Sequence, residues 1–299
     1  MVLARTNDAV VMGFTPARDV RFIFADVTET TRKLAAAHGL SIKGAAILGK
    51  ALAGIAVLHA FMDNANTQLC LTATLSGRVA GFHVEIDANG YLRGYLQEKS
   101  PETLIPPKGT DPDDLCGDSA IVKLSILRDN GEIHSQITSQ IPSGNPEQIC
   151  QALLKSIGPC RLALSADEID GRLFHVYAIA IVASSNCSRQ TFEAFAEHFK
   201  NGYIRQIMGF GVTLRSFRYS LGIPELETAP STELRLGCDC SLEKVLNAYA
   251  SEPRSVLESW IRSNTTRTFQ CHLCGKKYAI TPTMMAELLL RNPPANQDA

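Results

Sequence analysis

The sequence is poor in aromatic residues and has no surplus of charge of either sign. Only 7% of its 299 residues are aromatic, with a single tryptophan, and 29 basic residues are balanced by 30 acidic ones. General binders of nucleic acid or of anionic membranes normally carry a basic surplus. This balance argues against both partners. No internal repeat or low-complexity segment is apparent either, so we do not expect a repeat array.

The first residues do not show the pattern of a secretory signal, because no basic segment followed by an apolar one is present there. We therefore expect a cytoplasmic protein. The most apolar stretch, residues 44–62, contains Lys50 and His59 and is rich in small residues. It predicts a buried helix rather than a membrane span. At 45% hydrophobic residues, the chain can bury a substantial core.

Cysteine, by contrast, is abundant, and its spacing divides the nine residues into two groups. The first group is scattered, and we expect small buried side chains in a reducing compartment at Cys70, Cys116, Cys150, Cys160 and Cys187. The second group forms two close pairs, Cys238-Asp-Cys240 and Cys271-His-Leu-Cys274. Together the pairs offer four sulfurs to one ion, which is the ligand set of a tetrahedral zinc site. The spacing predicts one zinc ion per chain.

The pattern of apolar residues predicts an α+β protein of three parts. Residues 1–183 predict a two-sheet antiparallel core with helices. Helices are expected at 28–38, at 42–62 after Ser41, and from Asn145 to about Lys155. Strands at 68–75, 80–87 and 91–96 predict the first sheet, and strands at 120–127, 133–141, 161–164 and 173–183 predict the second. The proline-rich and acidic residues 99–118 predict a solvent-exposed loop.

Residues 184–232 predict a helical linker of low intrinsic stability. An amphipathic helix at 188–200 is followed by Gly202, Gly209 and Gly211, which lower helix propensity. Residues 233–299 predict a small zinc domain with helices at 242–249 and 253–263 and a final helix after Thr281. Strands at 266–270 and 277–280 would form a hairpin whose tip carries Cys271 and Cys274. The linker would be held only by docking.

Two functional classes remain compatible with such a site. Most four-cysteine zinc sites are permanently structural, and that alternative stays open. A zinc-ribbon binder of nucleic acid is the second, because Arg262, Arg267, Lys276 and Lys277 form a small basic group, although nearby glutamates offset it. An enzyme is not expected, because no Ser-His-Asp set, phosphate loop or metal-plus-glutamate arrangement stands out. No catalytic residue is assigned.

With these motifs placed, the chain resembles the heat shock protein 33 family of redox-regulated holdase chaperones. Cys238-Asp-Cys240-Ser241, followed by Glu243 and Lys244, is similar to that family's Cys-x-Cys-Ser element, and Cys271 to Tyr278 is similar to its second pair with a following aromatic. Weaker similarity covers residues 18–22, 47–52 and 75–95. One departure is Lys155-Ser156-Ile157-Gly158, which stands where the family has a Ser-Glu-Gln element.

The resemblance implies a function for the metal site. The reduced chain would hold zinc and be inactive. Oxidation to the disulfides Cys238–Cys240 and Cys271–Cys274 would release the ion, unfold the linker and expose a surface for unfolding client proteins, with a homodimer possible in the oxidised form. Phe192, Phe195 and Phe199, on one face of the linker helix, would be candidates for that surface.

Overall fold

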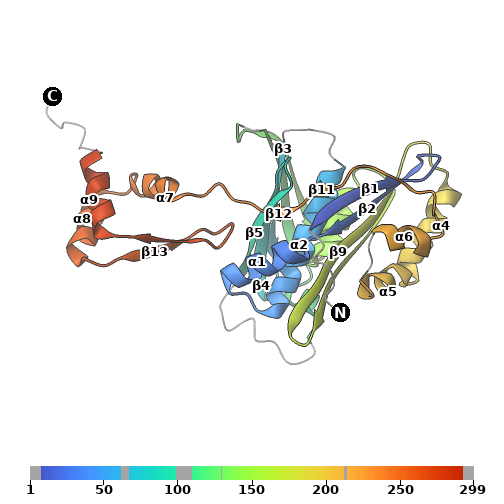
Figure 1. Ribbon diagram of the computed structural model, residues 1–299, viewed down its shortest axis with the longest axis horizontal. Coiled ribbons are helices and arrows are strands. Elements are labelled where there is room, and N and C mark those ends of the chain that lie inside the picture. Colours follow the sequence, from blue (N-terminus) through green and yellow to red (C-terminus); the bar gives the residue numbers. More distant parts are fainter. Residues whose placement is uncertain (1–7, 62–66, 99–109, 129, 212–213, 292–299) are drawn as a thin grey trace. The chain divides into compact units, whose positions relative to one another are not determined.

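The computed structural model of the chain describes residues 8–61, 67–98, 110–128, 130–211 and 214–291 (Figure 1). The chain divides into two compact units, Met1–Gly237 and Cys238–Ala299. The first unit is an α+β fold built on two six-stranded sheets, and the second contains helices and a two-stranded hairpin. The predicted fold class is confirmed.

One sheet of the first unit, sheet B, has the strand order β12-β5-β4-β3-β6-β7. All of its neighbouring strands are antiparallel except β12 and β5, which run parallel. The bounds are β3 Thr67–Leu75, β4 Val79–Ile86, β5 Tyr91–Glu98, β6 Ala120–Arg128, β7 Ile133–Ile141 and β12 Arg235–Leu236.

The other sheet, sheet A, has the order β10-β1-β2-β9-β8, and β11 also pairs with β1. Its strands are β1 Ala9–Phe14, β2 Val20–Asp26, β8 Cys160–Ile169, β9 Arg172–Ala183, β10 Glu227–Thr228 and β11 Thr232–Glu233. Strands β2 and β9 are apolar on both faces, as is usual when both faces of a sheet are covered.

The predicted assignment of strands to sheets is partly wrong. Strands β6 and β7, expected in the second sheet, extend the first, because β6 pairs with β3 from Thr67↔Arg128 to Leu75↔Ala120. Local alternation predicts a strand but not its neighbour, since pairing is decided by contacts between residues far apart in sequence.

Helix α2 (Ile42–Ala60) packs between the two sheets and is buried on almost every side. Ser41 accepts a hydrogen bond from the Gly44 amide at 3.1 Å and begins the helix as predicted. A Cβ at Gly54 would lie 2.4 Å from the Cys150 sulfur, so the small residue is required there. By length and composition α2 could cross a membrane, but 78% of its most apolar window is buried inside the protein.

Two shorter helices complete this core. Helix α1 (Thr28–His38) ends at Gly39 in a left-handed conformation, as predicted. Helix α3 (Pro146–Leu154) begins at Asn145, whose side chain accepts a hydrogen bond from the Glu147 amide at 2.7 Å. Both pack against α2.

The expected exposed loop at 99–118 is wrong in its second half. Residues 99–109 lie outside the described part of the chain. A short 3-10 helix, η2 (Pro112–Leu115), follows, and Leu115 and Cys116 are buried in the core. Asp113 forms an ion pair with Lys50 at 2.8 Å. The ion pair with Lys50 of α2 therefore helps to hold this acidic segment against the core.

The predicted linker contributes three helices to the first unit, α4 (Arg189–Lys200), α5 (Tyr203–Gly209) and α6 (Leu214–Ser220). They lie on the face of sheet A opposite α2 (Figure 1). Strands β10 and β11, which the sequence pattern did not predict, then attach the end of the linker to β1. The division into 1–183, 184–232 and 233–299 stays a prediction.

The second unit contains α7 (Leu242–Tyr249), α8 (Arg254–Ser263), the hairpin β13–β14 (Arg267–Gln270 and Lys277–Ile280) and α9 (Pro282–Arg291). All five elements occur where the sequence predicts them. Their apolar faces form a small core of six buried residues, namely Val245, Leu257, Tyr278, Ile280, Met285 and Leu288.

Candidate metal centre

The turn between β13 and β14 holds the second cysteine pair. The Cys271 amide donates to the Lys276 carbonyl at 2.9 Å, and the Gly275 amide donates to the Cys271 carbonyl at 2.8 Å. Gly275 has a φ of +72°, a conformation that side chains other than glycine rarely adopt. These bonds close a tight loop that brings Cys271 and Cys274 to the same side.

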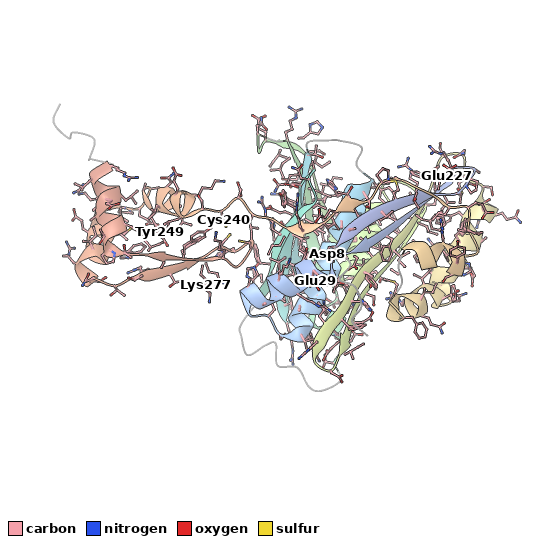
Figure 2. All side chains as sticks on the ribbon, viewed as in Figure 1. Asp8, Glu29, Glu227, Cys240, Tyr249 and Lys277 are labelled. Atoms are coloured by element: carbon pink, nitrogen blue, oxygen red, sulfur yellow. The ribbon has the colours of Figure 1, made fainter. Side chains whose placement is uncertain are left out.

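The first cysteine pair directly precedes α7. Ser241 begins that helix by accepting a hydrogen bond from the Lys244 amide at 3.1 Å, as predicted. The chain is extended at Ser241, with φ −140° and ψ 160°. An exposed ion pair between Lys244 and Asp239 also links the first turn of α7 to the residue between the two cysteines. Figure 2 marks Cys240 in this unit together with Tyr249 and Lys277.

The four sulfurs converge on one point. The Sγ atoms of Cys238, Cys240, Cys271 and Cys274 all lie within 4.8 Å of one another. The Sγ atoms of Cys238 and Cys271 are 3.9 Å apart, and those of Cys240 and Cys274 are 3.4 Å apart. Zinc–sulfur bonds of about 2.3 Å in a tetrahedron place sulfurs about 3.8 Å apart. The four thiols therefore fit a metal ion with a preference for soft ligands.

The pKa values of the four thiols also support binding of a metal cation. Burial and neighbouring sulfurs raise the pKa of Cys238 to about 11 and also raise the pKa of Cys274. At Cys240 burial acts in the same direction, but hydrogen bonds from Tyr278 and from the other thiols outweigh it and lower the pKa. Four adjacent thiolates repel one another, so a bound cation is what allows them to ionise together.

Tyr278 is a contributor that the sequence pattern did not assign to the site. Its hydroxyl donates to the Cys240 carbonyl at 2.8 Å and lies 3.1 Å from the Cys240 sulfur. Its own pKa is raised because ionisation would end the bond to Cys240. An aromatic residue four positions after Cys274 was visible in the sequence, but nothing in the sequence showed that its hydroxyl would bond to Cys240.

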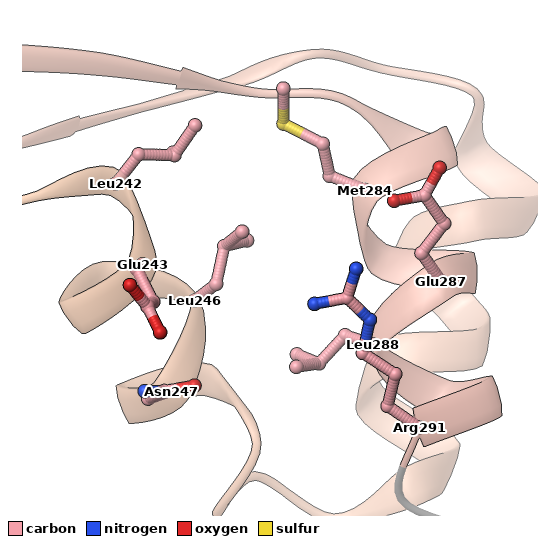
Figure 3. Close-up of a pocket in the computed structure, with 8 residues that line it drawn as sticks. All are labelled: Leu242, Glu243, Leu246, Asn247, Met284, Glu287, Leu288 and Arg291. Carbon is pink, nitrogen blue, oxygen red and sulfur yellow. The ribbon is translucent and has the colours of Figure 1, made fainter.

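Packing in the second unit is incomplete away from the sulfurs. A cavity of about 380 Å³ lies between α7 and α9 (Figure 3). Its apolar wall consists of Leu242, Leu246, Met284 and Leu288, and its polar rim of Glu243, Asn247, Glu287 and Arg291. A unit this small, with a core this thin, generally needs a metal or a covalent link to stay folded.

The five scattered cysteines are free thiols. The predicted burial is confirmed for Cys116, Cys150 and Cys160 and is wrong for Cys70 and Cys187, which are partly exposed. Burial raises the pKa of all five, and at Cys70, Cys116 and Cys150 it reaches about 12. Thiols with a raised pKa are poor nucleophiles, and no reactive role is assigned to these five.

The phenylalanines of α4 lie on the first unit. Phe192 is buried, while Phe195 and Phe199 are partly buried in the same apolar cluster. The ring of Phe195 meets the ring of Phe22 edge to face at 5.2 Å. The surface beneath them, which the sequence analysis missed, comes from alternate residues of β2 and β9: Val20, Phe22, Phe24, Tyr177, Ile179 and Ile181. Its signal was the period-two repeat of large apolar side chains.

Comparison with known proteins decides the family. A family model described as Hsp33 protein matches residues 8–155 and 212–281, which is most of the chain. The chain belongs to the Hsp33 family. Members of this family are chaperones, and the chaperone class therefore holds for this Hsp33 as well. The model leaves out residues 156–211, which include β8, β9, α4 and α5 as well as the departure at Ser156.

Individual relatives agree with this assignment of the Hsp33 chain. The 33 kDa chaperonin of Acaryochloris marina is 26% identical over 288 residues, covering 91% of this chain and 92% of the relative. That of Thermoanaerobacter pseudethanolicus is 22% identical over 290 residues, covering 95% and 98%. The crystal structure of the 33 kDa chaperonin from Thermotoga maritima has a TM-score of 0.80 at 18% identity, covering 96% of this chain and 99% of that one. The structural likeness shows a shared fold.

Proposed function

We propose that this protein is a redox-regulated holdase that binds one zinc ion per chain when it is reduced. The convergence of four sulfurs within 4.8 Å carries the proposal, because these residues can both hold the ion and be oxidised. Bound zinc would keep the thiolates deprotonated and hold the second unit together. Structural zinc contributes on the order of 10 kcal/mol or more in isolated fingers.

Oxidation would remove the ligands in pairs. Hydrogen peroxide takes two electrons from two thiolates and two protons from the solvent; a sulfur–sulfur bond forms, the O–O bond breaks, and the peroxide becomes two molecules of water. We propose Cys238–Cys240 and Cys271–Cys274 as the pairs, as the family resemblance implies. Two disulfides leave no thiolate to coordinate the ion, so the second unit would lose its main support. Peptide mapping by mass spectrometry after oxidation tests the pairing.

The linker would convert this loss into an exposed surface. Its helices cover apolar side chains of β2 and β9, and its end is held by short strands and by the Leu234 amide, which donates to the Asp8 carbonyl at 2.8 Å. Leu234 precedes the first ligand, Cys238, by only four positions. Release of residues 184–232 would uncover Phe192, Phe195, Phe199 and the sheet face beneath them, to which unfolding clients would bind.

The test combines zinc content with suppression of client aggregation, both measured before and after treatment with peroxide and mild heat. We expect zinc release to accompany new holdase activity. Zinc retained without activity would indicate a permanently structural site and would reject the proposal. Equal activity in both states would indicate a constitutive chaperone.

Two serine variants sharpen the test. Cys271→Ser removes one ligand, so we expect it to weaken zinc binding and to loosen the linker without an oxidant. Cys187→Ser is the matched control, because Cys187 is a partly exposed free thiol outside the cluster. Unchanged zinc content in Cys271→Ser would show that the assigned ligation is wrong.

The remaining assignments follow from the same proposal. Four clustered thiols that can be oxidised and five further free thiols fit a reducing compartment, for which we propose the cytoplasm. The partners would be unfolding proteins rather than nucleic acid or membranes, and no catalytic role is assigned. A homodimer of the oxidised form is part of the proposal.

A further inference from the structure

Tyr278 links the two cysteine pairs through a contact that spans 38 positions of the sequence. Its hydroxyl donates to the Cys240 carbonyl at 2.8 Å and lies 3.1 Å from the Cys240 sulfur. Tyr278 itself belongs to the hairpin whose turn carries Cys271 and Cys274, and it stands opposite Phe269 there. The hydroxyl therefore reaches from the hairpin of the second pair to a residue of the first pair.

The ring behind this hydroxyl is held firmly in place. Tyr278 is buried in the small core of the second unit. The Lys276 ammonium lies 5.1 Å from the centre of its ring, a distance at which the cation and the ring attract one another. A side chain that folding has already ordered loses little further entropy when it makes a hydrogen bond. The hydroxyl is therefore positioned before any metal ion binds.

This hydroxyl has one proton and two acceptors at hand, the carbonyl and the sulfur of Cys240. An uncharged thiol accepts a hydrogen bond weakly, and a disulfide sulfur is also uncharged. A thiolate accepts far more strongly, because hydrogen bonds to charged groups are roughly twice as strong as those between neutral groups. Metal binding turns Cys240 into a thiolate. The hydroxyl therefore interacts most strongly with the metal-bound form of Cys240.

The position of Cys240 makes this interaction relevant to oxidation. Cys240 is partly exposed, whereas Cys271 and Cys274 are buried. An oxidant in the solvent can therefore reach the Cys240 sulfur, and a thiolate is the form that attacks it. A hydrogen bond donated to that thiolate withdraws charge from the sulfur and makes it a weaker nucleophile. The same bond opposes loss of the ion and attack on the oxidant.

We propose that Tyr278 is a positioning residue that sets how readily the four-cysteine site is oxidised. Its hydroxyl turns from the Cys240 carbonyl to the Cys240 sulfur when that sulfur binds zinc, and it protects the ligand without touching the ion. A group that interacts more strongly with one state shifts the balance toward that state. The inference rests on the zinc binding and redox regulation proposed above and adds a residue that sets their threshold.

Tyr278→Phe tests the proposal, because it keeps the ring and removes only the hydroxyl. We expect the zinc affinity of the reduced full chain, measured by competition with a chelator, to fall about tenfold. Zinc release by hydrogen peroxide should become about threefold faster, because thiolate reactivity follows basicity with a coefficient of about 0.4–0.5. Emission of Trp260, which lies in the same core, should match the parent chain when zinc is bound. That match would show that the second unit is folded.

Cobalt(II) in place of zinc provides a readout that a purely structural role would not change. Its thiolate-to-metal charge-transfer band reports the charge on the sulfurs. A hydroxyl that bonds to the Cys240 sulfur stabilises the sulfur lone pair, so its removal in Tyr278→Phe should move the band to longer wavelength. An unmoved band would show that the hydroxyl serves the carbonyl alone and would overturn the proposal.

Tyr249→Phe is the matched control. Tyr249 belongs to the same core and contacts Trp260 and Phe269 through its ring, and within the described residues its hydroxyl bonds to no cysteine. This variant should keep the zinc affinity and release rate of the parent chain. Equal losses in both variants would trace the effect to core packing and would overturn the proposal, as would a Tyr278→Phe chain that matches the parent.

These measurements follow zinc alone and are therefore decided separately from holdase activity. A parent chain that releases zinc without gaining activity would reject the proposed function, and the faster release expected from Tyr278→Phe would still support the role of Tyr278. A parent chain that binds no zinc would overturn both.

Discussion

Asp26 is a buried carboxylate in a position that disfavours its charge. It is 8% exposed at the end of β2, where it accepts hydrogen bonds from the Thr28 amide at 3.0 Å and the Thr28 hydroxyl at 2.6 Å. Burial raises its pKa from 3.8 to about 6 despite these bonds. Its charged form therefore destabilises the folded protein.

The sign of the pH dependence follows from this shift. Below pH 3.8 Asp26 is protonated in both states, and it affects stability little. Between 3.8 and about 6 the unfolded chain ionises first, so stability falls as pH rises and then stays lower. We expect Asp26→Asn to raise the free energy of unfolding by about 1–3 kcal/mol at pH 8 and to change it little at pH 4.

Urea denaturation followed by far-ultraviolet circular dichroism at both pH values checks this expectation. The parent chain at pH 4 serves as the control. A variant that is less stable than the parent at pH 8 would show that the Thr28 bonds to the carboxylate outweigh its burial.

Residue-level features were predictable wherever the cause lies nearby in the sequence. Ser41, Asn145, Ser188 and Ser241 all begin helices by hydrogen bonds to amides two or three positions ahead. Helix α1 is different, because its amides at Glu29 and Thr30 donate to Asp8 at 2.9 and 2.6 Å (Figure 2). A partner about twenty positions away leaves no local pattern to recognise.

At the scale of elements, an ion pair attaches helix α5 of the linker to helix α3 of the core. Arg205 of α5 contacts Glu147 of α3 at 2.5 Å and donates to the Leu164 carbonyl at 3.3 Å. Arg205→Met keeps the aliphatic stem and removes the charge. Because Arg205 is 55% exposed, we expect a loss of only about 1 kcal/mol. Opening of α5, and with it amide hydrogen exchange at Ile207 and Met208, should rise roughly fivefold.

Lys200→Met is the matched control for Arg205→Met. Lys200 pairs with Glu193 at 2.7 Å within α4, so its loss removes a charge from the linker without freeing it from the core. Equal exchange rates at α5 in the Arg205 variant and the parent would show that apolar packing alone holds the linker. A rise in exchange in both variants would trace the effect to linker charge.

Elements themselves were largely predictable, but their placement was not. The apolar period of residues 188–200 predicts α4, whereas nothing in that period reveals that Phe195 would lie against Phe22. The two-residue strands β10 and β11 were missed because so short a segment carries no periodic signal. Their position is determined by β1, with which they pair.

At the scale of the whole molecule, the single tryptophan reports on one unit alone. Trp260 lies in α8, partly buried in the small core of the second unit. Its ring centroid is 5.0 Å from that of Tyr249, and the Arg267 guanidinium lies 3.8 Å above the ring. Its emission should therefore follow the folding of the second unit, whereas circular dichroism is dominated by the first unit, which contains most of the helical and strand residues.

Removal of metal under reducing conditions should separate the two signals. With a chelator, we expect Trp260 emission to shift to longer wavelength and its melting transition to fall or vanish, because the thin core and the cavity leave the second unit dependent on metal. Most of the circular dichroism signal, which comes from the first unit, should persist, and added zinc should reverse the shift in emission. Unchanged Trp260 emission in the metal-free chain would show that packing alone folds the second unit, and that the four thiols do not control its stability.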